Sequence, residues 1–382
     1  MKTHPHNVKT IKNENRALIF SQIRRAPTSR ADISKRTGMS KSAVTMITGD
    51  LIEEGQLIEI GEGSSPHGRK SILLDIVPTY RYAAGIALHR KYIYVCITDL
   101  KSNILAYSNH QLSKWNDPHA LLDFAYDEIL RFLTELGIPR EKCIGIGVSA
   151  PGPLDYENGT ILNPPDFPLF QNVSVDSYLE NKSGMPVMLD NNAVLLCMQE
   201  YMSSGADYKN SMFVVVSDGI GSAVMCDGRI FRGSRGFAGE LGHISVHSDG
   251  ISCECGNFGC LEKYVSIGAL QKKYGFSSYE KMVDDACMGD RASNDILAYI
   301  AREFASALAS AVNLFDLDSI VIYGQFSYRS DKLCSLMREE LSRRSFITRT
   351  HDVNLTFSQM SPDKASSSVC SMVINRYFEQ KL

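Results

Sequence analysis

Near the N-terminus, apolar residues recur at helical spacing between polar ones, and this pattern predicts three short helices in succession. The first is expected over residues 13–25 and is closed by Pro27. The second spans 29–37, capped by Ser29 and with Gly38 as its C-terminal turn, and the third runs to about Glu54 behind Ser40 as its N-cap. Two helices joined by a turn that contains glycine are typical of a helix-turn-helix, whose second helix enters the major groove of DNA.

Two alternating apolar runs follow, over 57–60 and 72–76, on either side of a loop rich in glycine, serine and proline. Period-two alternation around such a loop predicts a β-hairpin, or wing. The basic residues of this loop suit phosphates or a narrow minor groove. The residues predicted to face DNA are Ser40, Lys41, Ser42, Thr45, Thr48, Arg69 and Lys70. A three-helix packing module without DNA is the alternative, and the hairpin with a basic tip favours DNA binding over it.

After the hairpin, apolar runs alternate with helical segments, as is typical of an α/β protein. Three strands are expected from Tyr82 onward, before a helix over 120–136. The opening of strand, turn and strand recurs near Phe213, which predicts a duplicated fold with a cleft between two lobes. The segment MPVMLDNNAV is a strand that turns into a helix at Asn191 or Asn192. Both amides therefore lie at a helix N-terminus, where they could face the cleft.

Composition and charge agree with a folded protein of two or three domains. The chain has 382 residues, of which 44% are hydrophobic and 22% charged. Its net charge of -3 is uneven: residues 1–80 hold twelve Lys and Arg against eight Asp and Glu, so about +4, leaving about -7 for 81–382. A basic N-terminal segment followed by an acidic remainder indicates that the N-terminal segment binds nucleic acid. Because no apolar stretch resembles a signal peptide or a transmembrane helix, we expect a cytoplasmic protein without a membrane partner.

A cluster of sulfur ligands follows the second set of strands. Cys253, Cys255 and Cys260 lie within eight residues of one another, and thiolates this close in a chain without secretory features favour a tetrahedral metal site over disulfides. His243 and His247 are both near enough in sequence to be the fourth ligand. Sulfur with one imidazole favours zinc, and four protein ligands make the site structural. The alternative, three reduced buried thiols, is less favoured because the loop contains glycines that allow tight turns.

Together these motifs resemble the ROK family, named for repressors, open reading frames and kinases. The similarity covers nearly the full length and includes HGRK, SAPGPLDYENGTILNPP, the DGIG turn, GELGH and CECGNFGCLE. It implies an actin-like, two-lobed sugar-kinase fold over 81–382, behind a winged helix-turn-helix over 1–80. It further implies a zinc loop over 243–260, with the ligands His243, Cys253, Cys255 and Cys260. The residues that the resemblance assigns to sugar hydroxyls are Asn191, Asn192, Glu240, His243 and Glu262.

The chain departs from the kinases of this family wherever they handle ATP. Their first strand ends in a DxGxT-like loop, whereas GIALHRKYIYVC has no Asp, no glycine in the turn and no Thr. Their second glycine-rich turn is weakened here to SDGIGSA, in which Asp218 would repel phosphate. Asn192 stands where the kinases have the aspartate that takes the sugar proton, and losing a general base commonly costs about 10²- to 10⁴-fold in rate. Asp190 could substitute only if the turn aims it into the cleft.

We therefore expect a sugar-responsive DNA-binding regulator, a repressor of a carbohydrate-use operon, and not an enzyme. A homodimer or dimer of dimers would place recognition helices on half-sites of operator DNA. A sugar or sugar phosphate in the cleft would change lobe closure and thereby DNA affinity. Two alternatives stay open: an ATP-dependent sugar kinase with a DNA-binding head, and a DNA-binding regulator that responds to a protein partner. The sequence names neither the sugar nor the sign of its effect.

Overall fold

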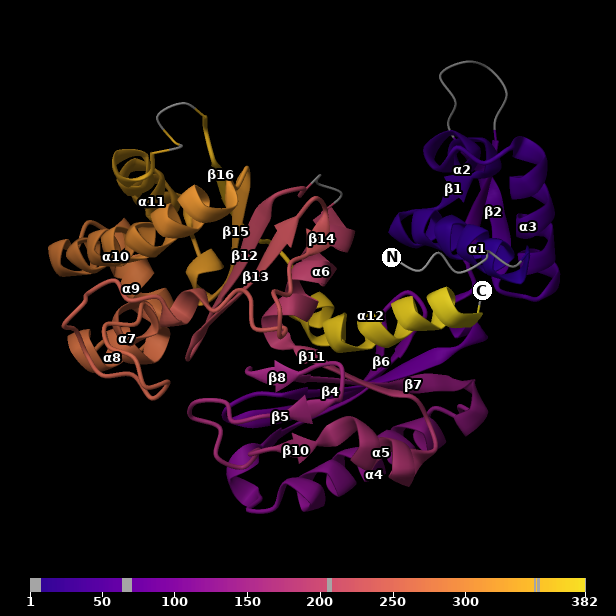
Figure 1. Cartoon of the computed structure of the whole chain (residues 1–382), viewed down its shortest axis with the longest axis horizontal. Coiled ribbons are helices and arrows are strands. Elements are labelled where there is room, and N and C mark those ends of the chain that lie inside the picture. Colours follow the sequence, from indigo (N-terminus) through magenta and orange to yellow (C-terminus); the bar gives the residue numbers. More distant parts are fainter. Residues whose placement is uncertain (1–7, 64–70, 205–207, 347, 349–350, 382) are drawn as a thin grey trace.

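A computed structural model describes residues 8–63, 71–204, 208–346, 348 and 351–381. It has an N-terminal head of three helices and a body of two α/β lobes (Figure 1). The C-terminal helix α12, Pro362–Lys381, runs between the head and the body (Figure 1). Within the described part of the chain, no helix combines the length and apolar character that a membrane crossing needs.

The head contains the predicted helices and hairpin. Its elements are α1 (Val8–Arg25), β1 (Thr28–Ser29), α2 (Arg30–Thr37), α3 (Lys41–Glu53), β2 (Leu57–Gly63) and β3 (Ser71–Ile76). The Ser29 hydroxyl accepts a hydrogen bond from the Asp32 N–H, and the Ser40 hydroxyl accepts from the Ala43 N–H, so both serines cap their helices as predicted. The three strands pair in the order β1-β3-β2. The loop over 64–70, with Arg69 and Lys70, lies outside the described residues.

The first lobe is a five-stranded sheet in the order β11-β7-β4-β5-β6. Its strands are β4 (Tyr82–Leu88), β5 (Tyr92–Asp99), β6 (Ile104–Gln111), β7 (Cys143–Ala150) and β11 (Val187–Asn191). The three predicted strands, β4 to β6, form an antiparallel meander, and β7 runs parallel to both β4 and β11. The helices α4 (Pro118–Glu135) and α5 (Val175–Ser183) pack on this lobe, next to the short strands β8 (Leu154–Asp155), β9 (Thr160–Ile161) and β10 (Val173–Ser174).

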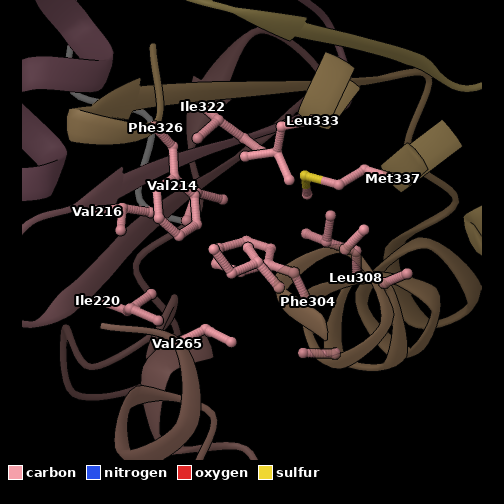
Figure 2. Close-up of a cluster of buried hydrophobic side chains, with 14 of the residues drawn as sticks. Val214, Val216, Ile220, Val265, Phe304, Leu308, Ile322, Phe326, Leu333 and Met337 are labelled. Atoms are coloured by element: carbon pink, nitrogen blue, oxygen red, sulfur yellow. The ribbon is translucent and has the colours of Figure 1, made fainter. Parts of the chain in front are cut away.

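The second lobe repeats this topology in the order β14-β13-β12-β15-β16. Its strands are β12 (Ser211–Val216), β13 (Ile220–Cys226), β14 (Arg229–Ile230), β15 (Ser319–Gly324) and β16 (Asn354–Phe357). The helices that complete it are α7 (Glu262–Val265), α8 (Ile267–Tyr274), α9 (Tyr279–Cys287), α10 (Arg291–Phe315) and α11 (Asp331–Arg344). Side chains from the sheet meet those of α10 and α11 in one buried core, around Phe304 and Met337 (Figure 2). The predicted duplication is confirmed, because each sheet pairs an antiparallel three-strand meander with two parallel strands.

One buried cluster joins the head to the first lobe. It contains Phe20 of α1 and Phe378 of α12, whose rings stack with centroids 4.1 Å apart. It also contains Leu195 of α6 (Asn192–Ser204), the helix that begins at the predicted sugar site. The division at residue 80 stays a prediction, because this core runs across it.

A partly buried chain of polar groups lies beside this core. The Arg24 guanidinium donates to the side chain of Asn375 and, at 3.4 Å, to the Ser102 hydroxyl. The Ser102 and Ser371 hydroxyls are 3.2 Å apart, and Ser371 Oγ donates to Gln199 Oε1 at 2.8 Å. Burial lowers the pKa of Arg24 to about 10. Hydrogen-bonding groups therefore lead from α1 of the head, through α12, to α6 of the body.

Candidate functional site

The four predicted metal ligands come together in one loop. The ligand atoms of His243, Cys253, Cys255 and Cys260 all lie within 4.8 Å of one another. Cys253 Sγ is 3.7 Å from His243 Nδ1, and Cys255 Sγ is 3.7 Å from Cys260 Sγ. In a tetrahedral zinc site with Zn–S of about 2.3 Å and Zn–N of about 2.0 Å, neighbouring ligand atoms are about 3.5 to 3.8 Å apart. The donor set and these two 3.7 Å spacings therefore fit such an ion.

The backbone of the loop makes this approach possible. Gly259 has a φ of 70°, and a Cβ there would lie 1.7 Å from the His247 carbonyl oxygen, so this position needs glycine. Asn257 Nδ2 donates to the His243 carbonyl at 3.1 Å and holds the two ends of the loop together. His247 Nε2 lies 2.9 Å from Glu303 Oε2 on α10, so this histidine anchors the loop to the body instead of joining the cluster.

Asn191 and Glu240 converge on one point of the cleft. A Cβ on Gly152 would lie 2.9 Å from Asn191 Nδ2 and 3.3 Å from Glu240 Oε1, so both side chains approach this glycine. Asn191 Oδ1 accepts a hydrogen bond from the Ala193 N–H at 2.8 Å, so the Nδ2 amino group of Asn191 can donate to other partners. These residues line a narrow pocket. The amide and the carboxylate come from segments about fifty residues apart, and the fold brings them together.

The ionisation of Glu240, the glutamate that lines the pocket, is shifted by its surroundings. Burial raises the pKa of Glu240, and the nearby Glu262 raises it further, while His243 and Arg90 oppose the shift. His243 directs Nδ1 toward Cys253, so its Nε2 is the nitrogen left to meet a ligand. Metal coordination would hold the orientation of this ring.

Glu262 and Asn192 are held by protein groups. The buried Glu262 accepts from the Ile220 N–H at 2.8 Å through Oε2, and Arg90 Nη1 lies 3.3 Å from its Oε1. Asn192 Nδ2 donates to the Leu88 carbonyl at 3.0 Å, which fixes the start of α6 to the end of β4. Each carboxylate oxygen can accept a second hydrogen bond, so these contacts leave Glu262 able to bind a hydroxyl.

The sequence did not indicate two further residues of the pocket. Arg232 donates to both carboxylate oxygens of Asp190, at 2.9 and 2.6 Å. Its guanidinium lies 4.4 Å from the centre of the Tyr156 ring, and both residues line the pocket with Asn191. Asp190 does reach the pocket, but both of its carboxylate oxygens accept hydrogen bonds from Arg232. No local pattern could have found this pair, since its members are 42 residues apart.

The turns at the positions of the kinase phosphate loops carry opposite charges. Lys91 Nζ, in the turn between β4 and β5, lies 2.8 Å from Asp218 Oδ2, in the turn between β12 and β13. Arg90 of the same turn reaches Glu262. The sequence contained a signal for the contact between Lys91 and Asp218, because HRK and SDG occupy equivalent turns of the duplicated halves.

The predicted DNA face is largely exposed, with one correction. Ser40, Lys41, Ser42 and Thr45 are solvent-exposed at the start of α3. The prediction that Thr48 points outward is wrong, because Thr48 is 0% exposed. Its hydroxyl donates to the Val44 carbonyl at 2.8 Å and accepts from Arg30 Nε at 2.9 Å. Thr48 follows Val44 by four residues, so both lie on the buried stripe of the helix.

Comparison with known proteins finds relatives that match this chain over most of its length. The chain is 28% identical to the xylose repressor of Bacillus spizizenii over 97% of both chains. It is 30% identical to the DNA-binding transcriptional dual regulator NagC of Escherichia coli, over 86% of this chain and 84% of NagC. A solved ROK family transcriptional regulator, a homolog of the E. coli MLC protein, superimposes with a TM-score of 0.80 at 22% identity, over 97% of this chain and 98% of that one.

The body alone also resembles sugar kinases. A ROK hexokinase from Thermus thermophilus superimposes with a TM-score of 0.62 at 25% identity, over 76% of this chain and 97% of its own. The hexokinase thus lacks a counterpart to about a quarter of this chain, and the two-lobed sugar-kinase fold is confirmed. The ROK family profile matches residues 83–367. The chain therefore belongs to the ROK family.

Proposed function

We propose that this protein is a sugar-responsive DNA-binding transcriptional regulator that represses genes of carbohydrate use and has no kinase activity. The observation that carries the proposal is the fusion of a helix-turn-helix head to a ROK body through one continuous buried core. A head connected by a flexible tether would move independently of a ligand in the body. A head that shares a core with α6 and α12 responds when those helices shift.

DNA binding is supported by the exposed start of α3. Its hydroxyls and the Lys41 cation can reach base edges and phosphates once the helix lies in a major groove. Met46, which is 60% exposed, adds an apolar contact for a thymine methyl group. The relatives named as repressors cover nearly this whole chain, head included. A homodimer, or a dimer of dimers, would place two such helices on half-sites about one helical turn or a multiple apart.

The absence of kinase activity is supported by the chemistry of the two turns. A nucleotide phosphate needs close backbone N–H groups, for which glycine leaves the path clear. Here Arg90 and Lys91 extend across the cleft to carboxylates, and the Asn192 amide is bonded to Leu88. Asp190, the carboxylate nearest to that position in the sequence, is paired with Arg232 and is therefore not available as a free catalytic base.

We further propose that the cluster of three cysteines and His243 holds a structural zinc ion. The donor set and the spacing of its atoms support zinc, and four protein ligands leave no position for a water. The ion would fix His243 at the edge of the pocket, where Glu240, Glu262 and the Asn191 amide can bind sugar hydroxyls. Xylose and N-acetylglucosamine are the first sugars to test, because relatives are named for them.

The helix α6 is proposed to carry the sugar signal. It begins at the pocket, and Gln199, two turns later, accepts from Ser371 of α12. The same hydroxyl contacts Ser102, which Arg24 of the head also contacts. Sugar binding that moves α6 would therefore change the position of the head. A ligand that prefers one state tenfold shifts the equilibrium by about 1.4 kcal/mol.

Selection of binding sites from random DNA, with and without each sugar of a hexose and pentose panel, tests the proposal. We expect one enriched palindromic operator whose recovery changes with one sugar. Failure to enrich any sequence contradicts the DNA-binding assignment. A coupled assay of ADP release over the same panel checks the second part, and turnover above background contradicts the absence of kinase activity.

A further inference from the structure

The turn between β4 and β5, residues 89–91, carries two adjacent cations that pair with two carboxylates of the other lobe. Arg90 Nη1 lies 3.3 Å from Glu262 Oε1, and Lys91 Nζ lies 2.8 Å from Asp218 Oδ2. Asp218 belongs to the corresponding turn of the second lobe, between β12 and β13. A salt bridge therefore connects equivalent turns of the two duplicated lobes.

The two ion pairs differ in burial, and this difference separates their roles. The Lys91 and Asp218 side chains are 72% and 45% exposed, so water and salt screen their attraction and the pair contributes little. The Arg90 and Glu262 side chains are only 22% and 6% exposed. Removing the cation from a buried pair leaves a carboxylate that neither water nor another cation fully compensates.

The surroundings of Glu262 are shaped around this pair. A Cβ on Gly219 would lie 2.6 Å from Glu262 Oε2 and 2.7 Å from Arg90 Nη1, so the backbone of the turn closes tightly over both groups. The Ile220 N–H holds Oε2 from the second lobe at 2.8 Å. The carboxylate is therefore fixed by one group from each lobe.

We propose that Arg90 is a positioning residue of the sugar site, which reaches from the first lobe to hold Glu262 of the second. Sugar hydroxyls add to the remaining acceptor positions of Glu262 without displacing Arg90. The carboxylate is correctly aimed only while the lobes stay together, so sugar affinity and lobe closure depend on each other. This inference rests on the proposed function, because it requires a sugar that uses Glu262.

The test compares Arg90→Ala with Lys91→Ala in the full-length protein. The two residues are neighbours with the same charge, and both contact the second lobe, so Lys91→Ala is a matched control. Calorimetric titration with D-xylose and with N-acetyl-D-glucosamine should show sugar affinity at least tenfold weaker for Arg90→Ala and within twofold of wild type for Lys91→Ala. Arg90→Lys, which keeps the cation, should recover part of the loss. Equal affinities in the two alanine variants would overturn the inference.

A second measurement separates this inference from the proposed function. If the wild-type protein binds neither sugar, the assignment of these sugars fails, but the contact itself can still be tested without ligand. Thermal unfolding of Arg90→Ala, Glu262→Gln and the double variant forms a double-mutant cycle. A double variant that loses less stability than the sum of the single losses supports the pairing. Additive losses would contradict it.

Discussion

Replacing Ser371 with alanine tests whether the partly buried polar chain connects the pocket to the head. The Ser371 hydroxyl donates to Gln199 Oε1 at 2.8 Å and lies 3.2 Å from the Ser102 hydroxyl. The substitution removes both contacts and leaves the buried Gln199 without this donor. A net hydrogen bond contributes about 0.5 to 1.5 kcal/mol, and an unsatisfied buried group costs about 1 to 3 kcal/mol. We therefore expect the free energy of unfolding to fall by about 1 to 3 kcal/mol in denaturant titrations.

Ser367→Ala is the matched control for this change. Ser367 lies one turn earlier on α12 and is also buried, but its hydroxyl donates to the Lys364 carbonyl within the same helix. Both variants should lose stability. Only Ser371→Ala should reduce the ratio of operator affinities measured by fluorescence anisotropy without and with sugar, by at least threefold.

The reasoning is refuted if Ser371→Ala loses stability but keeps the wild-type ratio. The chain would then be a structural feature of the interface between α6 and α12, and the signal would have to travel through the apolar contacts of the core. Equal changes of the ratio in both serine variants would also refute it, because they would reflect general loosening of α12.

Three further predictions follow from the structure. Metal analysis of the purified protein should find about one zinc per chain, and Cys255→Ser should lose the zinc and melt at lower temperature; wild-type protein without metal would contradict the site. Burial raises the pKa of Asp176 from 3.8 to about 6, so its contribution to stability is lost as the pH rises from about 4 to about 6, and the full cost of ionising it is present above that range. Asp176→Asn should therefore raise the melting temperature at pH 7.5, with the gain disappearing near pH 4; a gain independent of pH would exclude this cause. Phe378→Ala removes the ring that stacks on Phe20 and should lower the free energy of unfolding by about 3 to 5 kcal/mol in denaturant titrations. Phe346→Ala, at a side chain that is 74% exposed, should leave the free energy of unfolding nearly unchanged.

Much of the fold could be predicted from the sequence because the residues that begin, end and bury each helix and strand lie close together in the chain. The serine caps, the glycine turns and the alternating apolar runs each depend on residues close in sequence. The strand-to-helix turn at Asn191 was predictable for the same reason, and so was the sulfur cluster, whose ligands span 18 residues. Thr48 was predicted wrongly because polarity alone was taken as exposure, although its spacing from Val44 and Leu51 places it on the buried stripe.

The remaining parts of the site depend on contacts between distant segments. Nothing near Asp190 in the sequence indicates Arg232, and nothing near Glu262 indicates Arg90, 172 residues away. The polar chain is of the same kind, since Arg24 and Asn375 are 351 residues apart. Such pairs form only when the lobes and the head take their places, so periodicity and motif spacing cannot reveal them.

The central claim is that sugar in the cleft changes the affinity of the head for DNA. The most direct measurement is an anisotropy titration of the selected operator duplex with the full-length protein, at fixed salt, without and with the sugar that gives the largest thermal shift in the panel. A saturating sugar should change the dissociation constant at least tenfold, which corresponds to about 1.4 kcal/mol. An unchanged dissociation constant, under conditions where the sugar demonstrably binds, would contradict the account.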